Sequence, residues 1–213
     1  IYALNQRNRS KEVLLAVQQL NMNPQEMPAY VRHAIADAYL KLQQPAKAEP
    51  LYLSLFKEKN YVDYSVYAGL YYAYIEQEKF KQANQLIQEM DKTLPTFSYS
   101  DAKGVERTTH SDRLEYLSLK GLNYAYRNHH AKAEQYFQDL VEHAPSNVAF
   151  QNNWALIQRW REKPLDAEHT VSQWNGMTPI SQTTQINQMQ NAQMLGEIER
   201  WRAINQYLYQ NRT

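Results

Sequence analysis

The sequence has 213 residues and no cysteine, and its formal net charge of +1 accompanies a mean hydropathy of −0.75. The near-neutral charge argues against nucleic-acid binding, and the lack of cysteine excludes disulfides and Cys-ligated zinc. With only 5 Gly and 8 Pro, the chain has few of the turn residues that β-rich folds need, so we expect an all-α fold. No apolar run approaches the ~20 residues that span a bilayer, so this segment is not expected to insert into a membrane.

Small residues recur at nearly regular intervals along the predicted helices. These small residues are Val13, Ala48, Ala83, Ala133, Ala167 and Ala203. The intervals between them are 35, 35, 50, 34 and 36 residues. A larger apolar residue follows each of them one helical turn later: Val17, Tyr52, Ile87, Phe137, Val171 and Tyr207. Small residues at fixed positions are typical of helices that cross closely. Pro95, Pro145 and Pro179 each follow such a helix, where proline cannot continue it.

The most complete motif runs from Gly121 through Tyr124, Ala133 and Phe137 to Pro145. Its spacing is that of the tetratricopeptide (TPR) repeat, a helix–turn–helix unit of about 34 residues. We therefore expect an all-α, right-handed superhelical TPR solenoid that forms a single array over residues 1–213. The predicted divisions are a partial repeat at 1–24 and repeats near 29–62, 64–97, 114–147, 148–181 and, with weak signature residues, 184–213. The last is interpreted either as a divergent or capping repeat or as a partly ordered tail.

The 50-residue interval predicts an inserted loop at about 96–113. This stretch lacks helical periodicity, and it ends in Ser111-Asp112, a suitable N-cap for the next helix. Long insertions in repeat proteins are often functional, although a solvated excursion between repeats is an equal alternative.

In a TPR array, the first helix of each pair lines a concave face that binds ligands. Mapping the repeats onto that face predicts a binding site in which tyrosines alternate with carboxylates and other polar residues. The candidates are Tyr30, His33, Asp37, Tyr72, Glu76, Glu115, Ser118, Tyr126 and Asn152. Tyrosine rings stack on sugars or apolar side chains, and carboxylates pair with amines or hydroxyls. In the densest aromatic stretch, Tyr67, Tyr71 and Tyr74 share a helical face and are expected to be core, which leaves Tyr72 on the other side.

The motifs of enzymes and cofactor sites were not found. The sequence has no nucleophile elbow and no Gly-rich phosphate loop, so no catalytic residue and no cofactor are predicted. His129 and His130 lie in an expected turn without a second ligand pair at helical spacing, so no metal site is predicted either.

Several segments resemble one family, the Gram-negative outer-membrane exporters of poly-β-1,6-N-acetyl-D-glucosamine (PNAG). They are Ala3–Val13, Ala36–Ala48, the insertion at 96–113, Ala144–Asn147 and Arg159–Glu168. The resemblance implies a non-catalytic periplasmic TPR domain, with an outer-membrane β-barrel downstream in the full-length protein. It also implies two partners, partially de-N-acetylated PNAG and the periplasmic PNAG deacetylase. Since the sequence opens with Ile1, we interpret it as an internal segment, with any leader expected outside it.

Two other functions are compatible with a TPR array. One is a protein-interaction domain that binds a peptide or a folded partner, as TPR arrays commonly do. The other is a TPR platform fused to an enzyme, with catalysis elsewhere in the parent chain.

Overall fold

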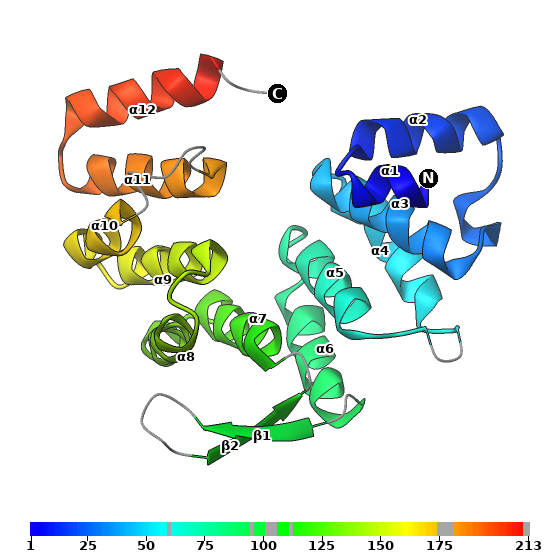
Figure 1. Ribbon diagram of the computed structural model, residues 1–213, viewed down its shortest axis with the longest axis horizontal. Helices are drawn as coiled ribbons and strands as arrows, with labels where there is room; N and C mark the ends of the chain where they lie inside the picture. The colour runs from blue at the N-terminus through cyan, green and yellow to red at the C-terminus, as the bar shows by residue number, and fades with distance from the viewer. Residues whose placement is uncertain (59–60, 94–95, 101–105, 111–112, 174–180, 211–213) are drawn as a thin grey trace. The chain divides into compact units, whose positions relative to one another are not determined.

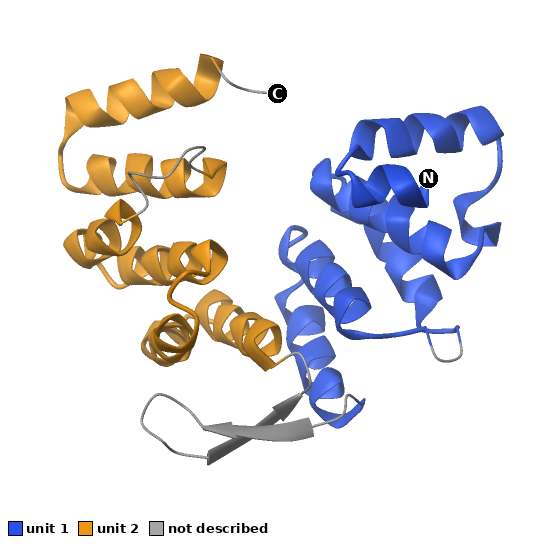
Figure 2. Ribbon diagram, viewed as in Figure 1, with its two compact units in different colours: residues 1–96, 110–112 blue, residues 97–109, 113–213 orange. Residues whose placement is uncertain are grey.

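A computed structural model describes residues 1–58, 61–93, 96–100, 106–110, 113–173 and 181–210 (Figure 1). The chain forms two compact units (Figure 2). Unit 1 holds residues 1–96 and 110–112, and unit 2 holds residues 97–109 and 113–213. The described residues are predominantly helical, as the composition predicts.

In unit 1, helices follow one another along the chain with short connections. They are α1 (Tyr2–Gln6), α2 (Ser10–Leu20), the 3₁₀ turn η1 (Pro24–Glu26), α3 (Ala29–Lys41), α4 (Pro45–Leu55), α5 (Tyr64–Ile75) and α6 (Phe80–Thr93). Each helix packs against its neighbours in sequence, so the unit is a stack of helix pairs such as α3 with α4 and α5 with α6.

Unit 2 continues in the same manner. Its helices are α7 (Arg113–Tyr126), α8 (His130–His143), α9 (Val148–Trp160), α10 (Pro164–Ser172), α11 (Gln182–Met194) and α12 (Ile198–Gln210). Here α7 pairs with α8, α9 with α10, and α11 with α12, and successive pairs stack through α8 on α9 and α10 on α11. The predicted repeat bounds and the single continuous array over both units stay predictions.

One type of turn joins the two helices of every pair. A residue in each turn has positive φ, between 55° and 75°, in the left-handed region: Asn8, Gln43, Glu78, Asn128, Glu162 and Gly196. The N–H group of the next residue donates to the carbonyl five positions earlier, as Gln44 N does to Tyr39 O at 2.8 Å. This is the Schellman ending of a helix. The turns recur at intervals of 35, 35, 50, 34 and 34 residues, by subtraction of those residue numbers.

The small residues of the sequence pattern lie five positions after these turns. Val13, Ala48, Ala83, Ala133 and Ala167 are all 0% exposed, which confirms that they occupy close packing positions. On the facing helix α7, a Cβ atom added to Gly121 would lie only 2.7 Å from Phe137 Cε2. The first helix therefore needs glycine at this point of close approach.

The prediction for the last position, Ala203, is wrong. Ala203 is exposed, and five residues after the turn at Gly196 comes Trp201. Trp201, Ile204 and Leu208 are the half-buried face of α12, and this helix contains no fully buried residue. An indole therefore stands where the other pairs have alanine or valine, and it is only half-buried.

The aromatic stretch of α5 divides as expected. Tyr67, Tyr71 and Tyr74 are buried, whereas Tyr72 is exposed. Seven of the twelve residues of α5 are buried, so this helix is enclosed on most of its circumference.

The inserted segment contains regular structure, and its description as a plain loop is corrected. Strands β1 (Thr96–Ser100) and β2 (Glu106–His110) form a two-stranded sheet. Residues 101–105 are too few for a parallel crossover, so the strands pair antiparallel. The stretch lacks a helical period because polar and aromatic residues alternate in it, as in Thr96-Phe97-Ser98-Tyr99-Ser100, and such alternation is typical of a β-strand. The expected N-cap at Ser111-Asp112, and Pro95 and Pro179, lie outside the described residues.

Gly196→Ala is expected to destabilise the chain by about 1 kcal/mol, because a Cβ is disfavoured in the left-handed region. Nothing lies within 4 Å of the added atom, so the backbone alone accounts for the loss. Glu162→Gly, at the equivalent turn, is expected to stabilise the chain, because glycine adopts positive φ without strain. Urea unfolding of both variants measures the difference, and a loss of stability in both would show that φ is not the deciding term.

Candidate binding site

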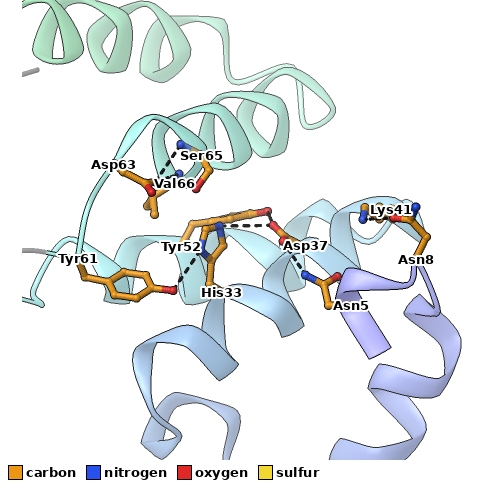
Figure 3. Close-up of polar contacts among 10 residues, drawn as sticks. All are labelled: Asn5, Asn8, His33, Asp37, Lys41, Tyr52, Tyr61, Asp63, Ser65 and Val66. Atoms are coloured by element: carbon orange, nitrogen blue, oxygen red, sulfur yellow. Dashed lines mark hydrogen bonds and ion pairs between the residues drawn. The ribbon is translucent and has the colours of Figure 1, made fainter. Parts of the chain in front are cut away.

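The unit 1 candidates His33 and Asp37 belong to one hydrogen-bonded group, here called the Asp37 cluster: Asn5, His33, Asp37, Tyr52 and Tyr61 (Figure 3). Tyr52 Oη donates to Asp37 Oδ1 at 2.7 Å, and Asn5 Nδ2 donates to Asp37 Oδ2 at 3.0 Å. His33 is one turn earlier on α3, and its Nε2 lies 3.6 Å from Asp37 Oδ1. Its Nδ1 is 3.3 Å from Tyr61 Oη. Helices α1, α3 and α4 thus converge on one carboxylate.

Burial keeps the tyrosines of the cluster protonated. Tyr52 is completely buried, and its burial, followed by the negative charge of Asp37, raises its pKa far above the usual range. Burial is also the main reason that the pKa of Tyr61 is raised, with the charge of Asp63 next. Tyr52 is therefore a permanent hydrogen-bond donor to Asp37 at physiological pH.

The Asp37 carboxylate is held rigidly but is not sealed off. Its side chain remains 30% exposed, and each carboxylate oxygen accepts one hydrogen bond from unit 1. A carboxylate oxygen has two lone pairs, so acceptor capacity remains for a ligand N–H or O–H group. A preorganised, partly desolvated carboxylate suits an amine or a hydroxyl.

Tyrosine rings and a second carboxylate belong to the same unit. Tyr30 is 52% exposed, and its ring lies edge-on to Tyr2 at 6.0 Å between centroids. Tyr72 is also exposed, and its ring contacts Tyr71. Glu76 is exposed at the end of α5, yet protein replaces part of the solvent around its carboxyl and raises its pKa. The charge of Glu76 in turn contributes to the raised pKa of Tyr52.

The four unit 2 candidates are placed differently. Glu115 is exposed on α7, and Tyr126 is half-buried with its ring 5.5 Å from Trp160. Ser118 and Asn152 are buried, so the prediction that they present side chains to a ligand is wrong. Asn152 is covered by α11, whose Thr184 and Asn187 are hydrogen-bonded to it. The common concave face of all nine candidates stays a prediction, since they divide between the two units.

Asn152 belongs to a group of buried polar residues that sequence reasoning missed. This polar seam between α9 and α11 consists of Asn152, Arg159, Thr184, Asn187 and Asn191. Asn152 Nδ2 donates to Thr184 Oγ1 at 3.0 Å, and Asn187 Nδ2 donates to Asn152 Oδ1 at 2.8 Å. The polar residues of α11 at 184, 187 and 191 follow a helical period, which was the available signal.

Arg159 is the charged member of the polar seam. Its Nη1 donates to Asn191 Oδ1 at 3.1 Å, and its Nη2 donates to Gln190 Oε1 at 2.7 Å. Burial among neutral amides lowers the pKa of Arg159 to about 10, so the guanidinium stays charged at neutral pH. The seam has its donors matched to acceptors of the adjacent helix, so it is a structural contact between helices.

The described residues contain neither a cluster suited to a metal ion nor a helix suited to a bilayer. No three His, Asp or Glu side chains in that part of the chain gather closely enough to hold a metal ion. Among the described helices, none combines the length and the apolar character that a bilayer span requires.

The fold has counterparts among solved structures. A tetratricopeptide repeat protein from Parabacteroides merdae ATCC 43184 has a TM-score of 0.69 at 13% identity, over 97% of this chain and 74% of that one. The chain has a tetratricopeptide repeat fold. A second structure with this likeness is Pseudomonas aeruginosa pilF, with a TM-score of 0.55 at 14% identity, over 98% of this chain and 86% of the other.

The sequence is similar to one kind of curated protein, and no family model matches it. It is 27% identical over 201 residues to the poly-beta-1,6-N-acetyl-D-glucosamine export protein of Escherichia coli (strain K12). The same identity holds for the protein of that name from Escherichia coli O157:H7. The match includes 92% of this chain, which spans about a quarter (24%) of the length of these relatives.

Tyr52→Phe is expected to destabilise the chain by about 1–3 kcal/mol, because it removes a buried donor to a charged group. Tyr30→Phe is the matched control, since Tyr30 is exposed and no hydrogen bond of its hydroxyl belongs to the Asp37 cluster; its effect should stay within about 0.5 kcal/mol. Chemical denaturation compares the two, and equal effects would mean that the Tyr52–Asp37 bond contributes no stability.

Glu76→Gln is expected to stabilise the chain slightly at neutral pH, within about 0.5 kcal/mol. Because its pKa is higher folded than unfolded, the charged carboxyl is disfavoured in the native state. The resulting loss of stability is absent well below the ordinary pKa of 4.5, where the carboxyl is protonated in both states. It develops as the pH rises through the raised pKa of Glu76 in the folded chain. Unfolding midpoints on both sides of this range test the sign, with exposed Glu199→Gln as control. A gain that is equal at both pH values contradicts the assignment.

Proposed function

We propose that this chain is a non-catalytic periplasmic scaffold in the export of a biofilm polysaccharide. The observation that carries the proposal is the 27% identity to a PNAG export protein along 92% of the chain. In this proposal, the chain binds partially de-N-acetylated PNAG and guides it toward an outer-membrane pore formed by another part of the full-length protein.

The Asp37 cluster supports this proposal chemically. Removal of acetyl groups leaves amines, which are cationic at neutral pH and pair with carboxylates. Asp37 offers a fixed, partly exposed carboxylate, and Glu76 adds a second one in the same unit. The exposed rings of Tyr30 and Tyr72 are suited to stacking on the faces of pyranose rings. A moderate, charge-based affinity suits transport, because a polymer must also leave each site.

A periplasmic PNAG deacetylase is the second proposed partner. A TPR array presents a large helical surface, which is the usual basis of its contacts with proteins. An array that holds both the enzyme and its product would deliver the modified polymer directly to the export path. A domain that binds only a peptide or a folded partner is the competing function.

The charge of the Asp37 cluster gives the first test. Asp37→Asn combined with Glu76→Gln is expected to weaken binding of β-1,6-glucosamine oligomers by about twofold to fivefold per lost pair, as for partly exposed ion pairs. Binding should also fall as salt is added. Isothermal titration of residues 1–213 measures both effects, with Glu199→Gln as the control for an exposed carboxylate and circular dichroism as the check on folding.

Two results would count against the proposal. If neither glucosamine nor N-acetylglucosamine oligomers bind, this segment does not guide the polymer, and protein binding becomes the better explanation. If glucosamine oligomers bind equally to the wild type and the double variant, the carboxylates of unit 1 are not part of the site.

A further inference from the structure

Unit 2 contains a groove that none of the candidate residues lines. Helices α8, α9 and α10 enclose a volume of about 760 Å³. Ligand sites in proteins commonly fall in the range of about 300–1,000 Å³. The groove is therefore large enough for one or two sugar residues or a short peptide segment.

Two residues of α9 that line this groove have buried polar atoms without a partner in the described part of the chain. Gln151 is 2% exposed; its Nε2 donates to Pro145 O at 3.2 Å, but its Oε1 accepts no hydrogen bond. Trp154 has a buried Nε1 that donates to nothing. The two are three positions apart, so they share one face of α9. One unused acceptor and one unused donor thus lie at the same groove.

Other buried polar side chains of α9 are satisfied. Gln158, which also lines the groove, accepts a hydrogen bond from Thr170 Oγ1 at 2.9 Å. Asn152 and Arg159 have the partners of the polar seam. Buried polar groups in proteins are generally hydrogen-bonded, so the two exceptions at one groove need an explanation. A bound ligand with the complementary groups provides one.

The chemistry of the pair matches a secondary amide. An amide N–H group can donate to Gln151 Oε1, and the amide oxygen of the same ligand can accept from Trp154 Nε1. The indole ring offers an apolar surface for a methyl group or a sugar face. The nearby carboxylate of Glu134 is neutralised by Arg161 and by Lys163, whose Nζ lies 3.1 Å from Glu134 Oε1. Asp166, the other carboxylate of the lining, is exposed at the groove surface, whereas the buried lining residues beside Gln151 and Trp154, such as Gln158 and Thr170, are neutral. The inner part of the groove therefore suits a neutral group.

We infer that this groove binds the acetamido group of an N-acetylhexosamine residue. The inference rests on the proposed function and gives the two units different tasks. The Asp37 cluster of unit 1 binds deacetylated residues through their amines, and the groove of unit 2 binds residues that kept the acetyl group. A partially deacetylated polymer carries both kinds of residue.

Ligand entry requires a small movement of side chains. Both unused atoms are covered from solvent, and exposed Gln138 and His169 are among the residues that line the groove. Gln138 Nε2 donates to Glu142 Oε1 at 3.2 Å on the exposed face of α8, and water can replace this surface bond when the side chain moves. Rotation of the terminal amide of Gln151, which releases its bond to Pro145 O, changes the direction of its Oε1.

The indole N–H resonance of Trp154 in residues 1–213 provides the test. We expect this resonance to shift with β-1,6-N-acetylglucosamine oligomers and to stay in place with fully deacetylated oligomers. Trp154→Phe, which keeps a ring but removes the donor, assigns the resonance and should weaken binding of the acetylated oligomer by about tenfold, the effect of one hydrogen bond. Trp201→Phe on α12, outside the groove, is the matched control and should leave that affinity unchanged.

Each outcome separates the two proposals. If acetylated oligomers bind while the Trp154 resonance stays unmoved and Trp154→Phe binds normally, the groove assignment is wrong and the proposed function stands. If an N-acetylated alanine peptide shifts Trp154 and the acetylated oligomer does not, the groove is a peptide site. If no oligomer of either kind binds, both the proposed function and this inference fail.

Discussion

The fold depends on one constraint, the left-handed turn that joins the two helices of each pair. It fixes the direction in which the second helix returns, and five residues later that helix reaches a point where only a small side chain fits. Alanine or valine stands there in the first five pairs. In the last pair Trp201 occupies the position, and α12 has no fully buried residue. The side chain at this position is completely buried in the first five pairs and half-buried in the last.

Close packing also positions the hydrogen-bonding groups of the Asp37 cluster in unit 1. Gly69 on α5 lies against the ring of Tyr52, and a Cβ at this position would overlap that ring. The missing side chain allows Tyr52 to lie between α5 and α3 and to donate to Asp37. The exposed part of the carboxylate is thus oriented by a hydroxyl that is itself positioned by core packing. A glycine that carries no polar group thus decides the geometry of the Asp37 cluster.

Much of the helical structure could be predicted because small residues and their apolar partners recur at a fixed interval. Local pattern could not reveal which polar positions are covered by a neighbouring helix. Asparagine is usually a surface residue, but α11 packs over Asn152 and supplies a hydroxyl and an amide that are hydrogen-bonded to it. His33 and Asp37 were identified by their helical position, whereas Asn5 and Tyr61 join them only through tertiary contacts. Likewise, the prediction placed Ala203 at the packing position of α12 because the spacing of apolar residues does not show that the turn lies at Gly196, which makes Trp201 the equivalent residue.

The polar seam between α9 and α11 has a consequence for the order of the helix pairs. All pairs in a repeat protein have similar shapes, so apolar surfaces alone discriminate weakly between correct and incorrect neighbours. Sliding α11 by one turn, or replacing it with another helix of the chain, would separate Arg159 from its amide acceptors and leave a buried charge unpaired. The seam therefore acts as a selectivity element, which admits one particular helix to this position and penalises its homologues within the same molecule.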